Sequence, residues 1–207
     1  ALLFGMYNVG YQHFHATGAT GSFIEMFAYG FLAVLPKIIV SYVVGLGIEF
    51  VVAQWKKEEI QEGFLVSGIL IPMIVPVDCP LWILAVATAF SVIFAKEVFG
   101  GTGMNVFNVA LITRAFLFFA YPTKMSGDAV WVSGDSIFGL GQTVDGLTVA
   151  TPLGAAATAG AYPEFSWDMV TGLIPGSIGE TSVIAIALGA ILLLWTGIAS
   201  WKTMFSV

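Results

Sequence analysis

The chain has 207 residues, of which 58% are hydrophobic and only 10% are charged, and its formal net charge is −6. Because soluble domains carry about 25% charged residues, this composition excludes an ordinary soluble domain. It also excludes a nucleic-acid-binding protein, since the 7 lysines and arginines form no basic patch. Cys79 is the single cysteine, so no intrachain disulfide can form.

In chain order, the apolar segments predict an all-α integral membrane protein. Residues 36–55 form the first span, because about 20 apolar residues cross a ~30 Å hydrocarbon layer as a helix. Residues 64–75 are too short to cross alone, and prolines around Asp78 separate them from a second short apolar segment at 81–95. Such broken half-helices point to a site within the membrane, although a tight hairpin of two tilted helices explains the pattern equally well.

Two further apolar segments are predicted to span at 105–121 and 182–201, and residues 122–181 between them form one long loop rich in glycine, serine, threonine and aspartate. The predicted fold is therefore a bundle of transmembrane helices with broken half-helices and one Gly-rich extramembrane loop. Because the chain begins and ends within apolar runs, we expect residues 1–207 to be a partial membrane domain of a larger subunit.

The lysines predict an orientation. If each apolar unit crosses once, four lysines lie on one common side, which the positive-inside bias assigns to the cytoplasm. These are Lys56, Lys57, Lys96 and Lys202, with Lys37 as the exception. The loop 122–181 contains six acidic residues and one lysine, so we expect it on the opposite side.

Within this loop, the stretch Asp145–Thr151 is the most informative motif. It reads Asp-Gly-Leu-Thr-Val-Ala-Thr and ends at a hydroxyl that small neighbours leave accessible to a phosphate. Asp145 and Thr148 are suited to binding main-chain amides in a turn, while Gly146 provides room. Taken alone, the pattern is equally consistent with an ordinary Gly/Thr-rich loop.

A second polar cluster follows the apolar segment 81–95. Gly100 and Gly101 allow a close backbone approach, and Asn105 and Asn108 would share one face if residues 105–121 are helical. A pair of carboxamides both donates and accepts hydrogen bonds, which suits the edge of a flavin or quinone ring. The alternative is that the two amides hold neighbouring helices together in the membrane.

Glu49 and Arg114 are ionisable groups inside apolar segments, where charges are costly and usually functional or paired. Either residue suits a cation or quinone site; alternatively, the two neutralise each other or a neighbouring subunit. His13 and His15 are spaced as in some metal pairs, but no cysteine or acidic cluster accompanies them, so no metal site is predicted.

Together these motifs resemble those of the B subunits of the sodium-translocating NADH:quinone reductases (Na⁺-NQR), a family to which the D subunit of the Rnf complex is related. The resemblance covers essentially the whole chain, in order and spacing. It rests on the runs 96–103, 114–122 and 126–128, the threonine motif 145–151, and the run 174–180.

The resemblance implies that Thr151 carries FMN through a phosphoester, with Asp145, Gly146 and Thr148 in its motif. It also implies a riboflavin held without a covalent bond near the glycine run, at positions Gly100, Gly101, Asn105, Asn108 and Arg114. Gly45 and Glu49 match family positions near the quinone and sodium functions, although Leu46 replaces the second glycine of that pattern.

The implied function is that of a membrane subunit passing electrons to ubiquinone or menaquinone, coupled to Na⁺ export. Its partners would be the other subunits of the reductase (types A, C, D, E and F), quinone, Na⁺, membrane lipid and a flavin transferase. Its location would be the bacterial inner membrane, with the FMN loop on the periplasmic side. The alternatives are an Rnf-type electron-transport subunit, a secondary transporter in which Glu49 binds a cation, and a purely structural subunit.

Overall fold

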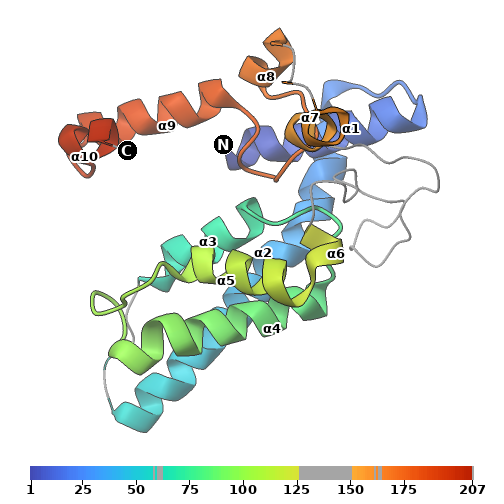
Figure 1. Cartoon of the computed structure of the whole chain (residues 1–207). Coiled ribbons are helices and arrows are strands. Elements are labelled where there is room, and N and C mark those ends of the chain that lie inside the picture. The colour runs from blue at the N-terminus through green and yellow to red at the C-terminus, as the bar shows by residue number, and fades with distance from the viewer. Residues whose placement is uncertain (58, 60–62, 126–150, 161, 163–164, 207) are drawn as a thin grey trace.

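The structure is a computed structural model that describes residues 1–57, 59, 63–125, 151–160, 162 and 165–206. Every regular element within these residues is helical, which confirms the all-α prediction (Figure 1). Two helical stretches, Phe23–Lys56 and Leu81–Phe99, are long and apolar enough to cross a membrane.

The N-terminal third forms two helices, and only part of the second was predicted from the sequence. Helix α1 (Leu2–Thr17) ends at Gly18, whose left-handed φ of 67° closes it, and contains both His13 and His15. Helix α2 (Phe23–Lys56) begins with a capping box, in which the Ser22 side chain and the Glu25 side chain satisfy each other's backbone N–H groups. The predicted span 36–55 is therefore the second part of a longer helix.

Helices α1 and α2 approach each other closely because glycines lie where they cross. A β-carbon added at Gly10 would overlap the backbone of Met26, and one added at Gly30 would overlap the backbone of Met6. Small residues at such positions let two membrane helices pack backbone to backbone. The Asn8 side chain adds a 3.0 Å hydrogen bond to the Ile174 carbonyl, which ties α1 to the C-terminal part of the chain.

The interrupted region differs from the prediction on one side of the break. Helix α3 (Phe64–Met73) is short, as expected. Helix α4 (Leu81–Ser91), however, continues through a π-helical turn, η1 (Val92–Lys96), and a 3₁₀ turn, η2 (Glu97–Phe99). The helical stretch after the break therefore begins where predicted and extends to Phe99, four residues beyond the predicted 81–95, which gives it the length of a membrane span.

Helices α5 and α9 are shorter than the two spans predicted at 105–121 and 182–201. Helix α5 (Val109–Ala120) begins four residues later than the predicted 105–121, because the Asn108 side chain caps it by accepting from the N–H groups of Ala110 and Leu111. Helix α9 (Val183–Trp195) ends before Gly197, whose φ of 72° breaks the predicted span 182–201. The other short helices are α6 (Pro122–Met125), α7 (Pro152–Ala159), α8 (Trp167–Thr171) and α10 (Trp201–Ser206).

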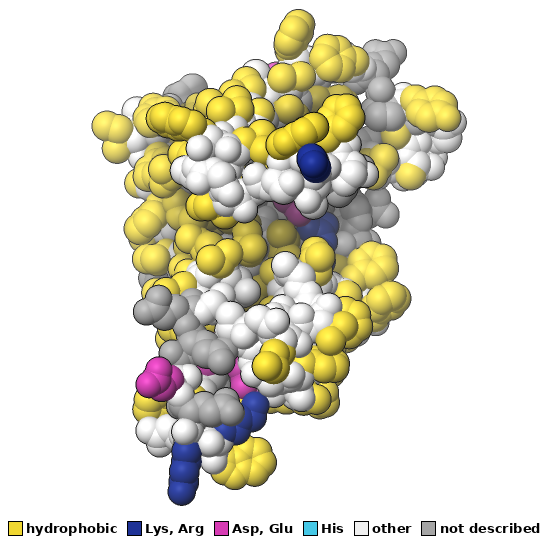
Figure 2. All heavy atoms as spheres, turned by 90° about the vertical axis from the view of Figure 1, so that its left-hand side faces the viewer, with side chains coloured by type: hydrophobic (Ala, Val, Ile, Leu, Met, Phe, Trp, Pro, Cys, Tyr) yellow, Lys and Arg dark blue, Asp and Glu magenta, His cyan; other side chains and the backbone are white. Residues whose placement is uncertain are grey.

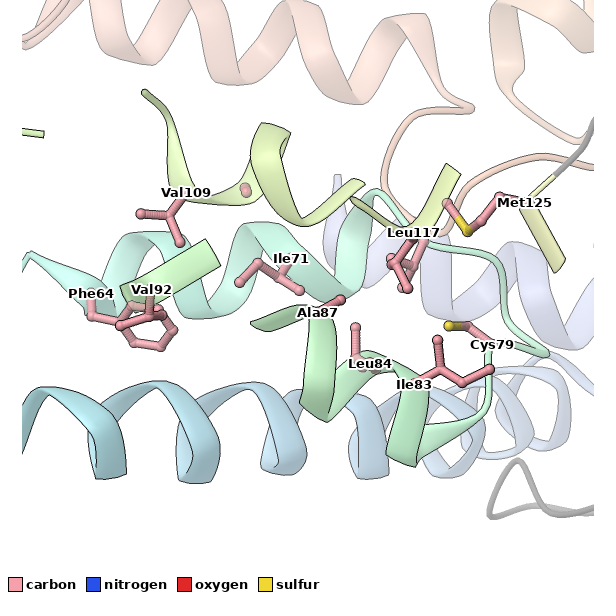
Figure 3. Packing of buried hydrophobic residues seen from close by; sticks show 12 residues of the cluster. Phe64, Ile71, Cys79, Ile83, Leu84, Ala87, Val92, Val109, Leu117 and Met125 are labelled. Carbon is pink, nitrogen blue, oxygen red and sulfur yellow. The ribbon is translucent and has the colours of Figure 1, made fainter. Parts of the chain in front are cut away.

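Helices α3, α4 and α5 pack together along the C-terminal half of α2 (Figure 1). Their shared core includes Phe64, Leu84 and Leu117, all fully buried (Figure 3). A second cluster joins α1 and α2 to Val77 of the α3–α4 connection and to Ile178. The connections 74–80 and 174–180 thus each contribute a buried side chain to this cluster.

The outer surface is largely apolar. Hydrophobic side chains cover most of the face in Figure 2, and charged side chains gather mainly toward its lower end. On α2, Val43 and Val51 are both 66% exposed, and the described α9 residues include none that is buried. Apolar faces of this extent suit contact with lipid or with other membrane helices, in agreement with the predicted membrane location.

Candidate functional site

A buried ion pair joins α2 to the π-helical turn. The Lys96 ammonium donates a hydrogen bond to Oε1 of Glu49, and the two side chains are only 5% and 4% exposed. Because a π turn holds an extra residue per turn, it changes the direction in which the following side chains project. Lys96 is its last residue.

This pair corrects one predicted alternative. Glu49 and Arg114 do not neutralise each other, because Glu49 pairs with Lys96 and Arg114 pairs with Glu180. Lys96 was not predicted as the partner of Glu49. A signal was available, since a carboxylate inside an apolar helix requires a cation and Lys96 stands directly after the apolar segment 81–95.

A second, outer ion pair lies beside the first. Lys56, at the end of α2, donates a 2.9 Å hydrogen bond to the backbone carbonyl of Glu97 and lies 3.6 Å from its carboxylate. Both pairs line a pocket of ≈ 20 Å³, about the room that one water molecule needs. Its lining consists of Glu49, Val52, Ala53, Lys56, Glu59, Lys96, Glu97 and Gly101.

Within this pocket, Oε2 of Glu49 is distinctive. It is buried and has no hydrogen-bond partner among the described residues, whereas Oε1 accepts from Lys96. A buried carboxylate oxygen without a donor carries a desolvation cost of about 1–3 kcal/mol. Oε2 is therefore placed to accept a hydrogen bond from a group in the pocket or to bind a cation there.

Arg114, which the resemblance places near the riboflavin, braces the backbone where α3 ends. Its Nη1 donates to the Ile74 carbonyl at 2.9 Å and lies 3.0 Å from a carboxylate oxygen of Glu180, with Ser177 Oγ at 3.5 Å. A 2.8 Å hydrogen bond from the Gly179 N–H to the Met73 carbonyl joins the same two segments. Arg114 thus links α5, the α3–α4 connection and the run 174–180.

Lys37 is the most deeply buried charged side chain among the described residues. It was predicted at one end of a span, but it lies inside α2, is fully buried, and donates to the Ala33 carbonyl at 3.4 Å. Asp78, in the α3–α4 connection, is an acidic group close enough to act on this charge. A second buried cation thus faces the broken part of the bundle.

The glycine run and the two amides adopt a loop. Gly100, Gly101 and Gly103 have φ values of 113°, 91° and 91°, a backbone conformation that glycine adopts readily. Asn105 accepts from the Gly103 N–H at 3.3 Å and donates to the Phe107 carbonyl at 3.1 Å. The prediction that Asn105 and Asn108 share one helical face was wrong, because the helix begins after both; both are nevertheless exposed in a single loop.

Thr151 is the residue that caps α7. The Gly154 N–H donates a 3.1 Å hydrogen bond to Oγ1 of Thr151, in which the threonine hydroxyl oxygen is the acceptor. Pro152 follows at the first helical position, where its missing N–H costs nothing. Thr151 itself is half-buried, and the next residue but one, Leu153, is 75% exposed. Asp145, Gly146 and Thr148 lie outside the described residues.

Gly45 lies against α3. A β-carbon at this position would overlap the ring of Phe64, so the glycine allows the aromatic side chain to pack on α2. Gly45 is one turn before Glu49 and is also buried. Its position therefore joins the packing of α2 and α3 to the Glu49 pocket.

The histidines form no metal site in the part of the chain that the structure describes. The ring of His13 stacks on that of Tyr29 at 4.1 Å between centroids, and His15 packs beside Tyr11. No group of three or more histidine, cysteine or acidic side chains suited to a metal occurs among the described residues.

Known proteins resemble this chain throughout its length. A model of the NQR2, RnfD, RnfE family matches residues 1–207. The B subunit of the Na⁺-translocating NADH-quinone reductase of Chromohalobacter salexigens is 41% identical over 228 residues, covering 100% of this chain and 54% of that protein. The B subunits from Ectopseudomonas mendocina and Azotobacter vinelandii are each 40% identical and are covered to 56%.

The chain thus spans about half the length of the curated relatives it matches. The similarity extends over every segment on which the resemblance in the sequence was based, and the match of the family model is complete from the first residue to the last. The chain belongs to the NQR2, RnfD, RnfE family.

Proposed function

We propose that this chain is the membrane part of the B subunit of a sodium-pumping NADH:quinone reductase. In this role it carries covalent FMN and a second, riboflavin cofactor and helps to pass electrons to ubiquinone or menaquinone. The proposal is supported by the 38–41% identity to proteins that bear this name, over the whole of this chain. The single structural observation that carries the flavin assignment is the position of Thr151 at the start of α7.

The surroundings of Thr151 fit a phosphate ester. Its hydroxyl oxygen accepts from the Gly154 N–H, so its own proton is not used in that bond and can be replaced. The N-terminus of a helix favours negative charge, and α7 has eight residues. Small residues follow, with Gly154 and Ala155 in the first turn. We infer that Thr151 holds FMN and that α7 helps to balance the charge of its phosphate.

The loop 99–108 is the proposed place for riboflavin. Its side chains combine two exposed carboxamides, Asn105 and Asn108, with exposed apolar groups such as Met104 (69%) and Val106 (64%). An uncharged flavin ring needs an apolar surface and a few placed hydrogen-bonding groups. The carboxamide oxygen of Asn108 caps α5, so its N–H groups are the ones suited to a ring carbonyl. Arg114, which the resemblance also places near the riboflavin, donates to the Ile74 carbonyl at the end of α3.

The chain's own residues would position the cofactors rather than perform acid–base chemistry. A bound flavin supplies the ability to accept one or two electrons, while the protein sets its position and electrostatics. Tethering at Thr151 keeps a carrier at a fixed effective concentration beside its partners. Gly45 shapes the α2–α3 contact, and Glu49 holds a negative charge inside the bundle, where a cation that crosses the membrane requires one.

The same proposal specifies surroundings and partners. The partners would be the other reductase subunits, quinone, Na⁺, membrane lipid and the transferase that attaches FMN. The location would be the bacterial inner membrane, with the segment around Thr151 on the periplasmic side. The second candidate is an Rnf-type electron-transport subunit, which the shared family model supports.

A denaturing gel viewed under ultraviolet light tests the covalent flavin. The chain is expressed as part of its complete complex in a host that makes the flavin transferase. The native band and Thr148→Val are expected to fluoresce, whereas Thr151→Val is expected to be dark. A dark native band would refute the proposal, and a fluorescent Thr151→Val band would move the attachment to another residue.

A further inference from the structure

The pocket beside Glu49 contains an imbalance of charge. Among the residues that the structure describes, its lining includes the carboxylates of Glu49, Glu59 and Glu97 and the ammonium groups of Lys56 and Lys96, which sum to a charge of −1. Lys56 forms the outer ion pair of the pocket with Glu97. The inner carboxylate has one oxygen on Lys96 and the other, Oε2, buried without a partner among the described residues.

A monovalent cation matches this imbalance in both charge and size. One positive charge would neutralise the lining, and the ≈ 20 Å³ volume accommodates a single small ion or water. An ion at Oε2 would, however, lie next to the Lys96 ammonium, which already holds the same carboxylate. Two positive charges at one carboxylate repel strongly in a setting of low dielectric constant.

We propose that Lys96 is an internal counter-ion that competes with the transported cation for Glu49. The ammonium holds the carboxylate when no metal ion is bound there, and a monovalent cation enters through the pocket in exchange for it. This inference rests on the proposed function of Na⁺ transport and makes Lys96 a positioning residue within it.

The geometry gives Lys96 a place to move. Lys96 ends the π-helical turn and is followed directly by the 3₁₀ turn Glu97–Phe99 and then by the glycine run. Gly100, at a φ of 113°, and Gly101, which lines the pocket, give the backbone next to it unusual freedom. The carboxylates of Glu59 and Glu97 line the same pocket, and because Lys56 balances only one of these two charges, the other can receive the ammonium as it leaves Glu49. The exchange therefore needs no buried charge to be left alone.

The discriminating experiment measures the Na⁺ concentration that half-saturates turnover of the complete complex. Lys96→Gln removes the competing charge, so half-saturation is expected at a concentration lower by about fivefold or more. Lys96→Arg introduces a guanidinium, whose planar pair of donors holds a carboxylate more firmly than an ammonium does. The Na⁺ concentration that half-saturates turnover is therefore expected to rise. The control is Lys57→Gln, which makes the same charge change at an exposed neighbour outside the pocket and is expected to have no effect.

If the role of Lys96 is purely structural, neither variant changes the Na⁺ concentration that half-saturates turnover. Opposite shifts in Lys96→Gln and Lys96→Arg support the exchange, and an unchanged or raised value in Lys96→Gln overturns it. If Lys96→Gln does not assemble with its flavins, Lys96→Arg alone decides, and an unchanged value there overturns the proposal.

A second measurement does not depend on turnover. A hydrophobic carbodiimide modifies protonated carboxyl groups, and a carboxylate that is paired with Lys96 is ionised and protected. In Lys96→Gln, Glu49 is expected to become labelled, and added Na⁺ is expected to suppress the label where choline does not. If Glu49 is labelled to the same extent with and without Na⁺, the proposed exchange is overturned. A native complex that has covalent flavin but no Na⁺-dependent turnover would instead refute the proposed function.

Discussion

Gly45 of α2 lies directly beneath the aromatic ring of Phe64 of α3, and only the missing side chain of the glycine allows the ring to reach that position. Phe64 is fully buried at this contact and belongs to the main core. Because Glu49 follows one turn later on the same helix, the contact fixes the distance between α3 and the wall of the pocket.

Gly45→Ala is expected to lower the Tm of the complex, because overpacking of a close contact costs about 1–3 kcal/mol. Gly47→Ala is the matched control, since a β-carbon there meets nothing within 4 Å. The measurement is thermal unfolding in detergent, followed together with the quinone concentration that half-saturates turnover. If Gly45→Ala changes only the quinone response and leaves Tm at the Gly47→Ala value, the packing role is wrong.

Arg114→Met is expected to loosen the contact between the α3 end and the run 174–180. It removes the partner of Glu180 and the donor to the half-buried Ile74 carbonyl, and leaving that acceptor unpaired costs up to about 1–3 kcal/mol. Glu180→Gln breaks only the exposed pair, for which we expect about 0–1 kcal/mol.

Limited proteolysis within residues 172–182 reports on this loosening. Faster cleavage in Arg114→Met than in Glu180→Gln is the expected order. Equal rates in the two variants would mean that the carbonyl bond to Ile74 contributes nothing.

Cys79 is expected to resist modification by a maleimide in the folded complex and to react fully after denaturation. Its side chain is 1% exposed in the core between α3 and α4. Mass spectrometry before and after denaturation measures the labelled fraction. Rapid labelling of the native protein would show that the α3–α4 connection opens to solvent.

Cysteines introduced at exposed positions test the predicted orientation, with Cys79 as an internal background. Tyr162 is 98% exposed, and we expect Tyr162→Cys to react with an impermeant maleimide in intact cells. Lys57→Cys, on the predicted cytoplasmic side, is expected to react only after lysis. The reverse pattern would place the Thr151 segment in the cytoplasm.

The helical membrane class is predictable from the sequence because it depends on composition and on long apolar runs. The sequence also contains boundary signals of another kind. The capping pair Ser22 and Glu25 marks the start of α2, and Asn108 marks the start of α5 as a helix-capping residue. Both helices begin at positions other than the predicted ones because hydropathy does not detect helix caps.

The candidate site was predictable only in part. Glu49 and the glycine run stand out as a charge and a flexible segment in apolar surroundings, and they do meet at one pocket. The partner of Glu49 could not be deduced with certainty, because 47 positions separate it from Lys96 and the π-helical turn redirects that side chain. The bracing role of Arg114 depends on a backbone carbonyl and on Glu180, 66 positions away.

The central claim is that Thr151 carries the flavin, and mass spectrometry of the proteolytic peptide containing Thr151 tests it most directly. The account predicts a peptide heavier by one FMN less one water, with fragment ions that place the added mass on Thr151 and not on Thr148. An unmodified Thr151 peptide, from a complex made together with the flavin transferase, would contradict the account.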